Sequence, residues 1–210
     1  MRMVILGPPA AGKGTQAEAI MKKLNILAVS TGDLLREAII RQTPVGLQAK
    51  AYMDVGELVP DEVIIGIILD RLSRDDCKGG YILDGVPRTI VQAETLEKKG
   101  IVIDVVLLIE ISDEEAMGRI GGRRACPVCN SIYHVVSKPP AKEGICDYCH
   151  TTLMTRKDDT PETIRHRLQT YHTETKPLIS HYEAQGKLRT VYNIPGIAQT
   201  TAAVFNVLGI

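Results

Sequence analysis

Short apolar runs alternate along the chain with stretches in which apolar residues recur at helical spacing. The runs that predict strands are Met3–Leu6, Ile26–Val29, Tyr81–Leu83, Val105–Ile109 and Leu188–Tyr192. From Ala17 to Leu24, apolar residues recur every three to four positions, which gives a helix one apolar face. Strands separated by such helices predict an α/β fold, a doubly wound parallel sheet with helices on both faces.

The segment from Val63 to Leu72 is apolar on nearly all sides. The residues Pro60, Asp61 and Glu62 precede it and are typical of a helix start. The run also continues past the usual length of a strand. We therefore predict a buried helix, while periodicity alone leaves a buried strand as the alternative.

A glycine-rich stretch from Gly7 to Thr15, GPPAAGKGT, lies between the first predicted strand and helix. Its backbone N–H groups can turn onto an anion, and the helix N-terminus adds the positive end of its dipole. Lys13 would reach the β- and γ-phosphates of a nucleotide. An ordinary turn is the alternative, but the order of strand, lysine and helix favours a phosphate loop. In the common phosphate-loop motif a Ser or Thr directly follows the lysine, whereas here the hydroxyl comes one residue later, at Thr15. This shift argues against a direct hydroxyl ligand to Mg²⁺.

Two further loops follow predicted strands. The stretch from Ser30 to Arg36 is by itself only a helix cap with a charged first turn. The strand at Tyr81–Leu83 is followed by Asp84, where a carboxylate can hold Mg²⁺ or its waters, and by Arg88, which can grip a phosphate. Ligands of open α/β sheets bind beyond the carboxyl ends of the strands, so we expect these loops to meet in one cleft.

Four cysteines are spaced as C-x₂-C, sixteen residues, C-x₂-C; they are Cys126, Cys129, Cys146 and Cys149. This spacing predicts a structural zinc site with no open coordination position. Iron in the same four-sulfur site is the alternative, and disulfides are disfavoured in a chain without a secretory signal. We expect local structural roles for His134 and His150 and an inert buried thiol at Cys77.

Charge and hydropathy argue against binding to nucleic acid or to a membrane. The chain of 210 residues carries 25 basic and 25 acidic side chains, so no net field attracts nucleic acid or an anionic membrane. No leader pattern precedes the first strand, and the apolar runs are too short to span a bilayer. We predict a cytoplasmic protein that binds neither nucleic acid nor membrane.

Arginines frame the cysteine-containing segment. Arg119, Arg123 and Arg124 precede the segment and Arg156 follows it. Arg165 and Arg167 are about 200° apart on the next predicted helix, so both cannot face one cleft. Phosphoryl transfer needs positive charge around the equatorial oxygens of the moving group, and arginines supply that charge.

Taken together, these motifs resemble those of adenylate kinases with a long, zinc-binding lid. The resemblance covers nearly the whole chain and rests on Gly7–Gln16, Ser30–Arg36, Asp84–Thr89, Gly122–Arg124 and Arg156–Asp159. It implies a monomer that catalyses the Mg²⁺-dependent reaction of ATP with AMP to give two ADP. It also implies a P-loop core at 1–29, 60–121 and 160–210, with two inserts. These are a small helical flap at 30–59 that binds the nucleoside monophosphate and a zinc-ribbon-like, zinc-binding lid at 122–159.

The resemblance further implies roles for individual residues. The ATP site would comprise Pro9, Ala10, Ala11, Gly12, Lys13, Gly14, Thr15, Arg119, Arg123, Ile132, Tyr133 and Ala198. The AMP site would comprise Thr31, Arg36, Glu57, Leu58, Val59, Gly85, Val86, Pro87, Arg88, Gln92, Arg156 and Arg167. Asp84 would order the waters of Mg²⁺, and Asp158 and Asp159 would orient the lid arginines, so that these three act in catalysis with Lys13, Arg88, Arg123, Arg156 and Arg167.

Three departures from the family pattern affect the finer expectations. Ala10 replaces a glycine, Val86 replaces phenylalanine and Glu57 replaces lysine. The β-carbon of Ala10 restricts positive φ, so we expect a reshaped loop there. The alternatives are a monophosphate kinase with a UMP or CMP acceptor or a GTP donor, and a nucleotide-switched module whose zinc ribbon binds nucleic acid or protein.

Overall fold

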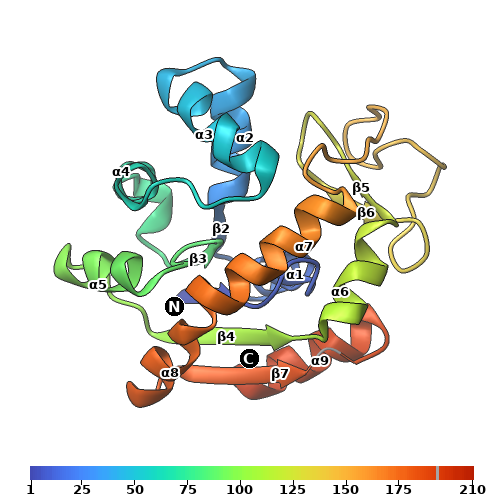
Figure 1. Cartoon of the computed structure of the whole chain (residues 1–210). Coiled ribbons are helices and arrows are strands. Elements are labelled where there is room, and N and C mark those ends of the chain that lie inside the picture. The colour runs from blue at the N-terminus through green and yellow to red at the C-terminus, as the bar shows by residue number, and fades with distance from the viewer. Residues whose placement is uncertain (193) are drawn as a thin grey trace.

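The computed structural model describes residues 1–192 and 194–210 and is built on a parallel five-stranded sheet (Figure 1). The strands follow the order β2-β3-β1-β4-β7. Their bounds are β1 Arg2–Leu6, β2 Leu27–Ser30, β3 Tyr81–Asp84, β4 Val105–Glu110 and β7 Leu188–Tyr192. All five predicted strands are therefore confirmed, and the parallel pairing brings their carboxyl ends to one edge.

Helices cover both faces of this sheet. They are α1 Lys13–Leu24, α2 Thr31–Ile40, α3 Pro44–Val55, α4 Asp61–Leu72, α5 Ile90–Lys98, α6 Asp113–Ile120, α7 Pro161–Thr170, α8 Pro177–Ala184 and α9 Ile197–Leu208. A short 3₁₀ helix spans Asp75–Cys77, and the π-helix η2 spans Tyr171–Thr175. The segment after Pro60 is helical, as predicted, and the alternative of a buried strand is wrong.

The core is divided by the sheet into two apolar layers. Met3 and Ile5 of β1 pack in a cluster with residues of α1 and α9. Val4 and Leu6 pack on the opposite side, in a cluster with residues of α2, α4, α5 and α8. Successive side chains of a strand point to opposite faces, so a continuous apolar strand serves both layers. Burial on both faces is thus the reason why β1 contains no polar residue after Arg2.

Two small parts project from the sheet near its carboxyl edge (Figure 1). One contains α2 and α3, which pack so closely that a Cβ on Gly46 would lie 2.2 Å from the backbone of Ala38. The other contains the antiparallel strands β5 Arg123–Ala125 and β6 Ile132–His134, which the sequence analysis did not predict. We call the first part the flap and the second part the lid.

Glu18 of α1 is one of the residues through which the core contacts the lid. Glu18 of α1 accepts hydrogen bonds from Lys138 Nζ at 2.9 Å and from Tyr148 Oη at 3.2 Å. Burial opposes ionisation of Glu18, but hydrogen bonds from Lys22 and Lys138 outweigh it and lower the pKa to about 2. The carboxylate therefore stays charged and ties the lid to α1.

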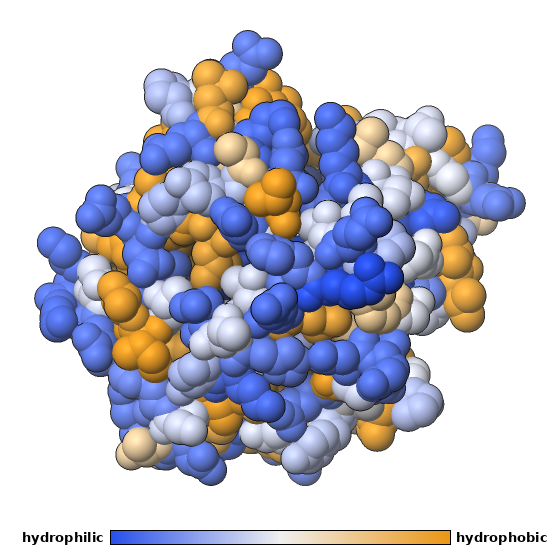
Figure 2. Space-filling model, in the orientation of Figure 1, coloured by the Kyte–Doolittle hydropathy of each residue, from blue (hydrophilic) through white to orange (hydrophobic). Residues whose placement is uncertain are grey.

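The exterior is mixed in character. On the face drawn in Figure 2, hydrophobic residues are scattered among hydrophilic ones. Within the described part of the chain, no helix has the length and apolar character needed to cross a membrane.

Candidate active site

A cavity of about 480 Å³ lies at the carboxyl edge of the sheet, between the phosphate loop and the lid. Every residue predicted for the ATP site except Ala198 lines it, namely Pro9, Ala10, Ala11, Gly12, Lys13, Gly14, Thr15, Arg119, Arg123, Ile132 and Tyr133. Ala198 is exposed, and its neighbours Ile197 and Thr200 line the cavity instead. The cleft expected from the strand order is therefore present.

A second, smaller cavity lies beside the flap. It is lined by most residues predicted for the AMP site, namely Thr31, Arg36, Glu57, Leu58, Val59, Gly85, Arg88, Gln92 and Arg167, together with Asp158. Arg156 lines the larger cavity, Pro87 lines a third cavity that also contains Arg88 and Arg167, and Val86 is buried in the core. Arg36, Arg88 and Arg167 line both the larger and the smaller cavity, so they lie where two ligands would meet.

The phosphate loop leaves β1 in an unusual backbone conformation. Gly7 has φ 144°, and a Cβ there would lie 2.3 Å from the carbonyl oxygen of Ile109, so only glycine fits. Gly12 has φ 89°, and Ala10 has φ 60° despite its β-carbon. The expected restriction at Ala10 thus does not keep this residue out of the left-handed region.

Lys13 is folded back across the loop. Its Nζ donates hydrogen bonds to the carbonyl oxygens of Gly7 and Pro8, each at 2.8 Å. Burial lowers the pKa of Lys13 to about 8, although the negative charge of Asp84 acts in the opposite direction. An anion in the loop would restore the ammonium form, because opposite charge favours it.

Asp84 ends β3 close to the phosphate loop. A Cβ on Gly14 would lie 3.9 Å from Asp84 Oδ2. Burial raises the pKa of Asp84, while Lys13 and Arg88 lower it. A single carboxylate beside a phosphate site suits Mg²⁺, which keeps most of its waters and binds through one or two carboxylates and the substrate phosphates.

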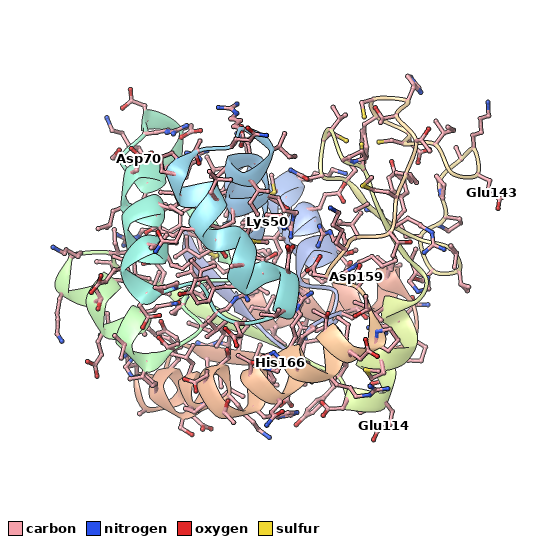
Figure 3. All side chains as sticks on the ribbon, turned by 45° about the horizontal axis from the view of Figure 1, so that its top comes forward. Lys50, Asp70, Glu114, Glu143, Asp159 and His166 are labelled. Atoms are coloured by element: carbon pink, nitrogen blue, oxygen red, sulfur yellow. The ribbon has the colours of Figure 1, made fainter. Side chains whose placement is uncertain are left out.

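Six arginines, each from a different segment, line the two cavities, namely Arg36, Arg88, Arg119, Arg123, Arg156 and Arg167. Arg123 of β5 forms a two-point ion pair with the buried Asp159, and Arg167 of α7 pairs with Asp158. Figure 3 shows Asp159 on the inner side of the lid and Glu143 at its outer edge. Burial and neighbouring guanidinium groups lower the pKa of Arg156 and Arg167 to about 10. The site therefore carries positive charge that its own carboxylates do not neutralise.

Arg36 offers a buried hydrogen-bond donor at the meeting point of the two cavities. Its Nη2 donates to Asp33 Oδ1 at 2.6 Å. Among the described residues, the buried Nε of Arg36 is left without a hydrogen-bond partner. Buried donors are usually satisfied, so this N–H is suited to a ligand phosphate.

Three residues that line the cavities were not predicted as site residues. Gln16 and Lys138 line the larger cavity, and Thr175 lines the third. Gln16 directly follows the phosphate-loop motif, which was a usable signal. Thr175 donates from Oγ1 to the carbonyl oxygen of Arg88 at 2.9 Å from within the π-helix. A π-helix has no pattern that the periodicity of the sequence reveals.

The four cysteine sulfurs gather within the lid, where all lie within 4.8 Å of one another. Three of the Sγ–Sγ distances are 3.3 Å for Cys126 and Cys149, 3.5 Å for Cys129 and Cys146, and 3.6 Å for Cys149 and Cys129. A tetrahedral zinc ion with Zn–S bonds of about 2.3 Å places its sulfurs about 3.8 Å apart. The cluster therefore fits a metal ion bound by four thiolates.

Neither histidine of the lid joins this cluster. His134 Nε2 lies 3.1 Å from the carbonyl oxygen of Arg119, and its Nδ1 accepts from the backbone of Val136 and Ser137. His150 is exposed with φ 58°. Cys77 is buried and lies apart from the four, where Arg71 contacts its sulfur. These positions agree with the local roles expected for all three.

Comparison with known proteins connects this geometry to one family. A sequence model of the family described as adenylate kinase matches residues 5–187. The adenylate kinases of Caldicellulosiruptor bescii and Caldicellulosiruptor saccharolyticus are each 51% identical to the chain over 214 residues, with both chains fully covered. That of Ruminiclostridium cellulolyticum is 50% identical over the same length, again with full coverage. On these matches, and with the fold and paired cavities described above, the chain belongs to the adenylate kinase family.

Proposed function

We propose that the chain catalyses reversible, Mg²⁺-dependent transfer of a phosphoryl group from ATP to AMP, giving two ADP. The observation that carries this proposal is the set of arginines shared by two adjoining cavities, Arg36, Arg88 and Arg167. A phosphoryl group moving between two nucleotides passes through the point where their sites meet. The transferred group carries negative charge, so the reaction needs positive charge at that point.

In the proposed donor site, the loop amides and Lys13 hold the ATP phosphates. Arg119 packs on the adenine, which Ile132 and Tyr133 also line, and Arg123 reaches the phosphates. Mg²⁺, when bound with ATP, would supply positive charge against the charge that develops on the phosphates, and Asp84 is the residue that would hold its waters. Ala198 stays a weaker candidate, because its exposed side chain lies outside the cavity.

In the proposed acceptor site, AMP occupies the cavity beside the flap. Arg36 and Arg88 bind its phosphate, Thr31 and the stretch from Glu57 to Val59 contact the nucleoside, and Gln92 meets the base. Arg156 and Arg167 span both nucleotides. Asp158 and Asp159 keep Arg167 and Arg123 in place through the ion pairs described above.

Transfer is in line and involves no covalent enzyme intermediate. The flap at 30–59 and the lid at 122–159 close over the core at 1–29, 60–121 and 160–210, and closure expels water that would otherwise accept the phosphoryl group. Zinc in the cysteine cluster holds the lid together as one body. We place the reaction in the cytoplasm and assign it to a monomer.

The decisive experiment is product analysis with Mg-ATP and AMP, GMP, CMP or UMP, alongside a control without acceptor. We expect two ADP for each ATP consumed, with AMP alone. Turnover with a different acceptor would replace the substrate assignment, and absence of AMP-dependent turnover in intact, metal-replete protein would overturn the proposal.

A further inference from the structure

Asp61, the first residue of α4, accepts two hydrogen bonds from the start of α5. Gln92 Nε2 donates to Asp61 Oδ1 at 2.7 Å, and Thr89 Oγ1 donates to Asp61 Oδ2 at 3.2 Å. The other end of the Gln92 amide is also engaged, since Oε1 accepts from the backbone N–H of Arg88 at 2.7 Å. Gln92 is 1% exposed and lines the smaller cavity.

These partners allow only one orientation of the Gln92 amide. A backbone N–H can only donate, and an ionised carboxylate can only accept. If the amide were turned over, its NH₂ would face the N–H of Arg88 and its oxygen would face Asp61. Both contacts would then be lost, which is costly for a buried side chain.

The orientation decides which base the amide can read. A carboxamide has two N–H donors and two acceptor lone pairs, so Gln92 keeps one of each for a ligand. The pairing edge of adenine presents an amine donor beside a ring-nitrogen acceptor. That of guanine presents a carbonyl acceptor beside an N–H donor, in the reverse order. An amide held in one orientation therefore matches one purine and opposes the other.

We propose that Asp61 is a positioning residue that sets the choice between adenine and guanine as acceptor base, by holding the amide of Gln92 in one orientation. The inference rests on the proposed function, in which Gln92 meets the base of the monophosphate. Asp61 itself does not line the cavity and acts through Gln92 and Thr89.

A purely structural role for Asp61 is the competing explanation. Asp61 and Glu62 both lie in the first turn of α4, where negative charge favours the helix. Glu62 is exposed, and the hydrogen bonds that Gln92 and Thr89 donate are accepted by Asp61 rather than by Glu62. Glu62→Gln is therefore a matched control that removes the same charge from the same turn.

The test compares kcat/KM for AMP and for GMP in the wild type, Asp61→Leu, Asp61→Asn and Glu62→Gln. The leucine variant removes the acceptor for Gln92, and we expect its AMP-to-GMP ratio to fall about tenfold, within the usual range for one two-point base contact. In Asp61→Asn the new amide can pair with the Gln92 amide in either of its orientations, so the AMP-to-GMP ratio should fall by only about threefold. In Glu62→Gln the ratio should stay within about twofold of wild type.

A structural role would lower turnover with both nucleotides together and leave their ratio unchanged. An unchanged ratio in folded Asp61→Leu overturns the inference; if that variant does not fold, an unchanged ratio in Asp61→Asn does so. The two proposals fail differently. Wild-type protein that does not use AMP refutes the proposed function, whereas normal AMP selectivity in the Asp61 variants refutes only the role of Asp61.

Discussion

Arg167 Nη1 lies 2.8 Å from Asp158 Oδ2, so an ion pair joins α7 to the segment that leaves the lid. Arg167 lines the cavities, whereas Arg165, two residues earlier on α7, is exposed. We predict that Arg167→Met lowers kcat by about 100-fold or more, since under the proposed mechanism it removes a charged donor to the transferred group.

The matched control for this prediction is Arg165→Met. It removes the same charge from the same helix, and we expect kcat within about twofold of wild type, as for other surface changes. Steady-state kinetics with saturating ATP and AMP measures both variants. Equal loss of activity in the two would mean that α7 contributes general charge or stability and no specific contact.

Lys13 should take up a proton when ATP binds at alkaline pH. Its pKa is lowered to about 8 by burial, so at pH 8.5 most of the free protein carries a neutral lysine, and bound phosphate favours the charged form. The phosphates of ATP are already fully ionised at that pH. We expect uptake of about half a proton or more at pH 8.5, little at pH 7, and affinity that falls as the pH rises above 8.

Calorimetry of ATP binding without AMP or Mg²⁺, in buffers of different ionisation enthalpy, measures this uptake. The same protein at pH 7 is the control for the measurement at pH 8.5, so no variant is needed. Arg156 and Arg167, with pKa values of about 10, stay charged at both pH values and should not contribute. The same uptake at both pH values would contradict the assignment to Lys13.

Ala10→Gly should stabilise the phosphate loop. Ala10 has φ 60°, a conformation that costs a residue with a β-carbon about 1 kcal/mol or more. Glycine removes this strain but adds freedom to the unfolded chain, so we expect the free energy of unfolding to rise by about 0.5 kcal/mol. Urea denaturation measures the difference.

Ala11→Gly is the control for that substitution. Ala11 is fully buried and is not among the residues with positive φ. Glycine there relieves no strain and removes a packed methyl group, so the free energy of unfolding should fall by about 1 kcal/mol. If Ala10→Gly destabilised the chain to the same extent, the left-handed conformation of Ala10 would not be a source of strain.

Removal of the zinc that we propose for the lid should affect stability before it affects catalysis. The four sulfurs lie within 4.8 Å of one another, and four thiolates would fill the tetrahedral shell of zinc and leave no open position for a substrate. We expect one zinc per chain, and chelation should lower the thermal midpoint by about 5 °C or more while activity at moderate temperature persists.

Cys129→Ser should reproduce the effect of chelation, whereas Cys77→Ser should leave the metal content unchanged, because Cys77 lies outside the cluster. Elemental analysis and calorimetry provide the measurements. An equal loss of activity in a protein that remains folded would show that the ion does more than hold the lid together.

Much of the fold could be predicted because its signals are local. The strand at Met3–Leu6, the glycine-rich loop and the helix after Lys13 form one uninterrupted stretch, and each limits the conformation of the next. The cysteine pairs are likewise a local signal, since each C-x₂-C spacing makes a tight turn that can place two thiolates on one ion. Alternation of apolar runs and helical periodicity then determined a parallel sheet with its loops at one edge.

Tertiary structure alone decided how distant groups share these sites. Thr175 reaches the carbonyl oxygen of Arg88 across 87 positions, and Lys138 reaches Glu18 across 120. The orientation of Gln92 depends on Asp61, which is 31 positions away. Such contacts follow from how distant elements pack on one another, and no periodicity within a short window encodes them. The sequence thus determined which chemical groups are available, and packing determined which of them meet.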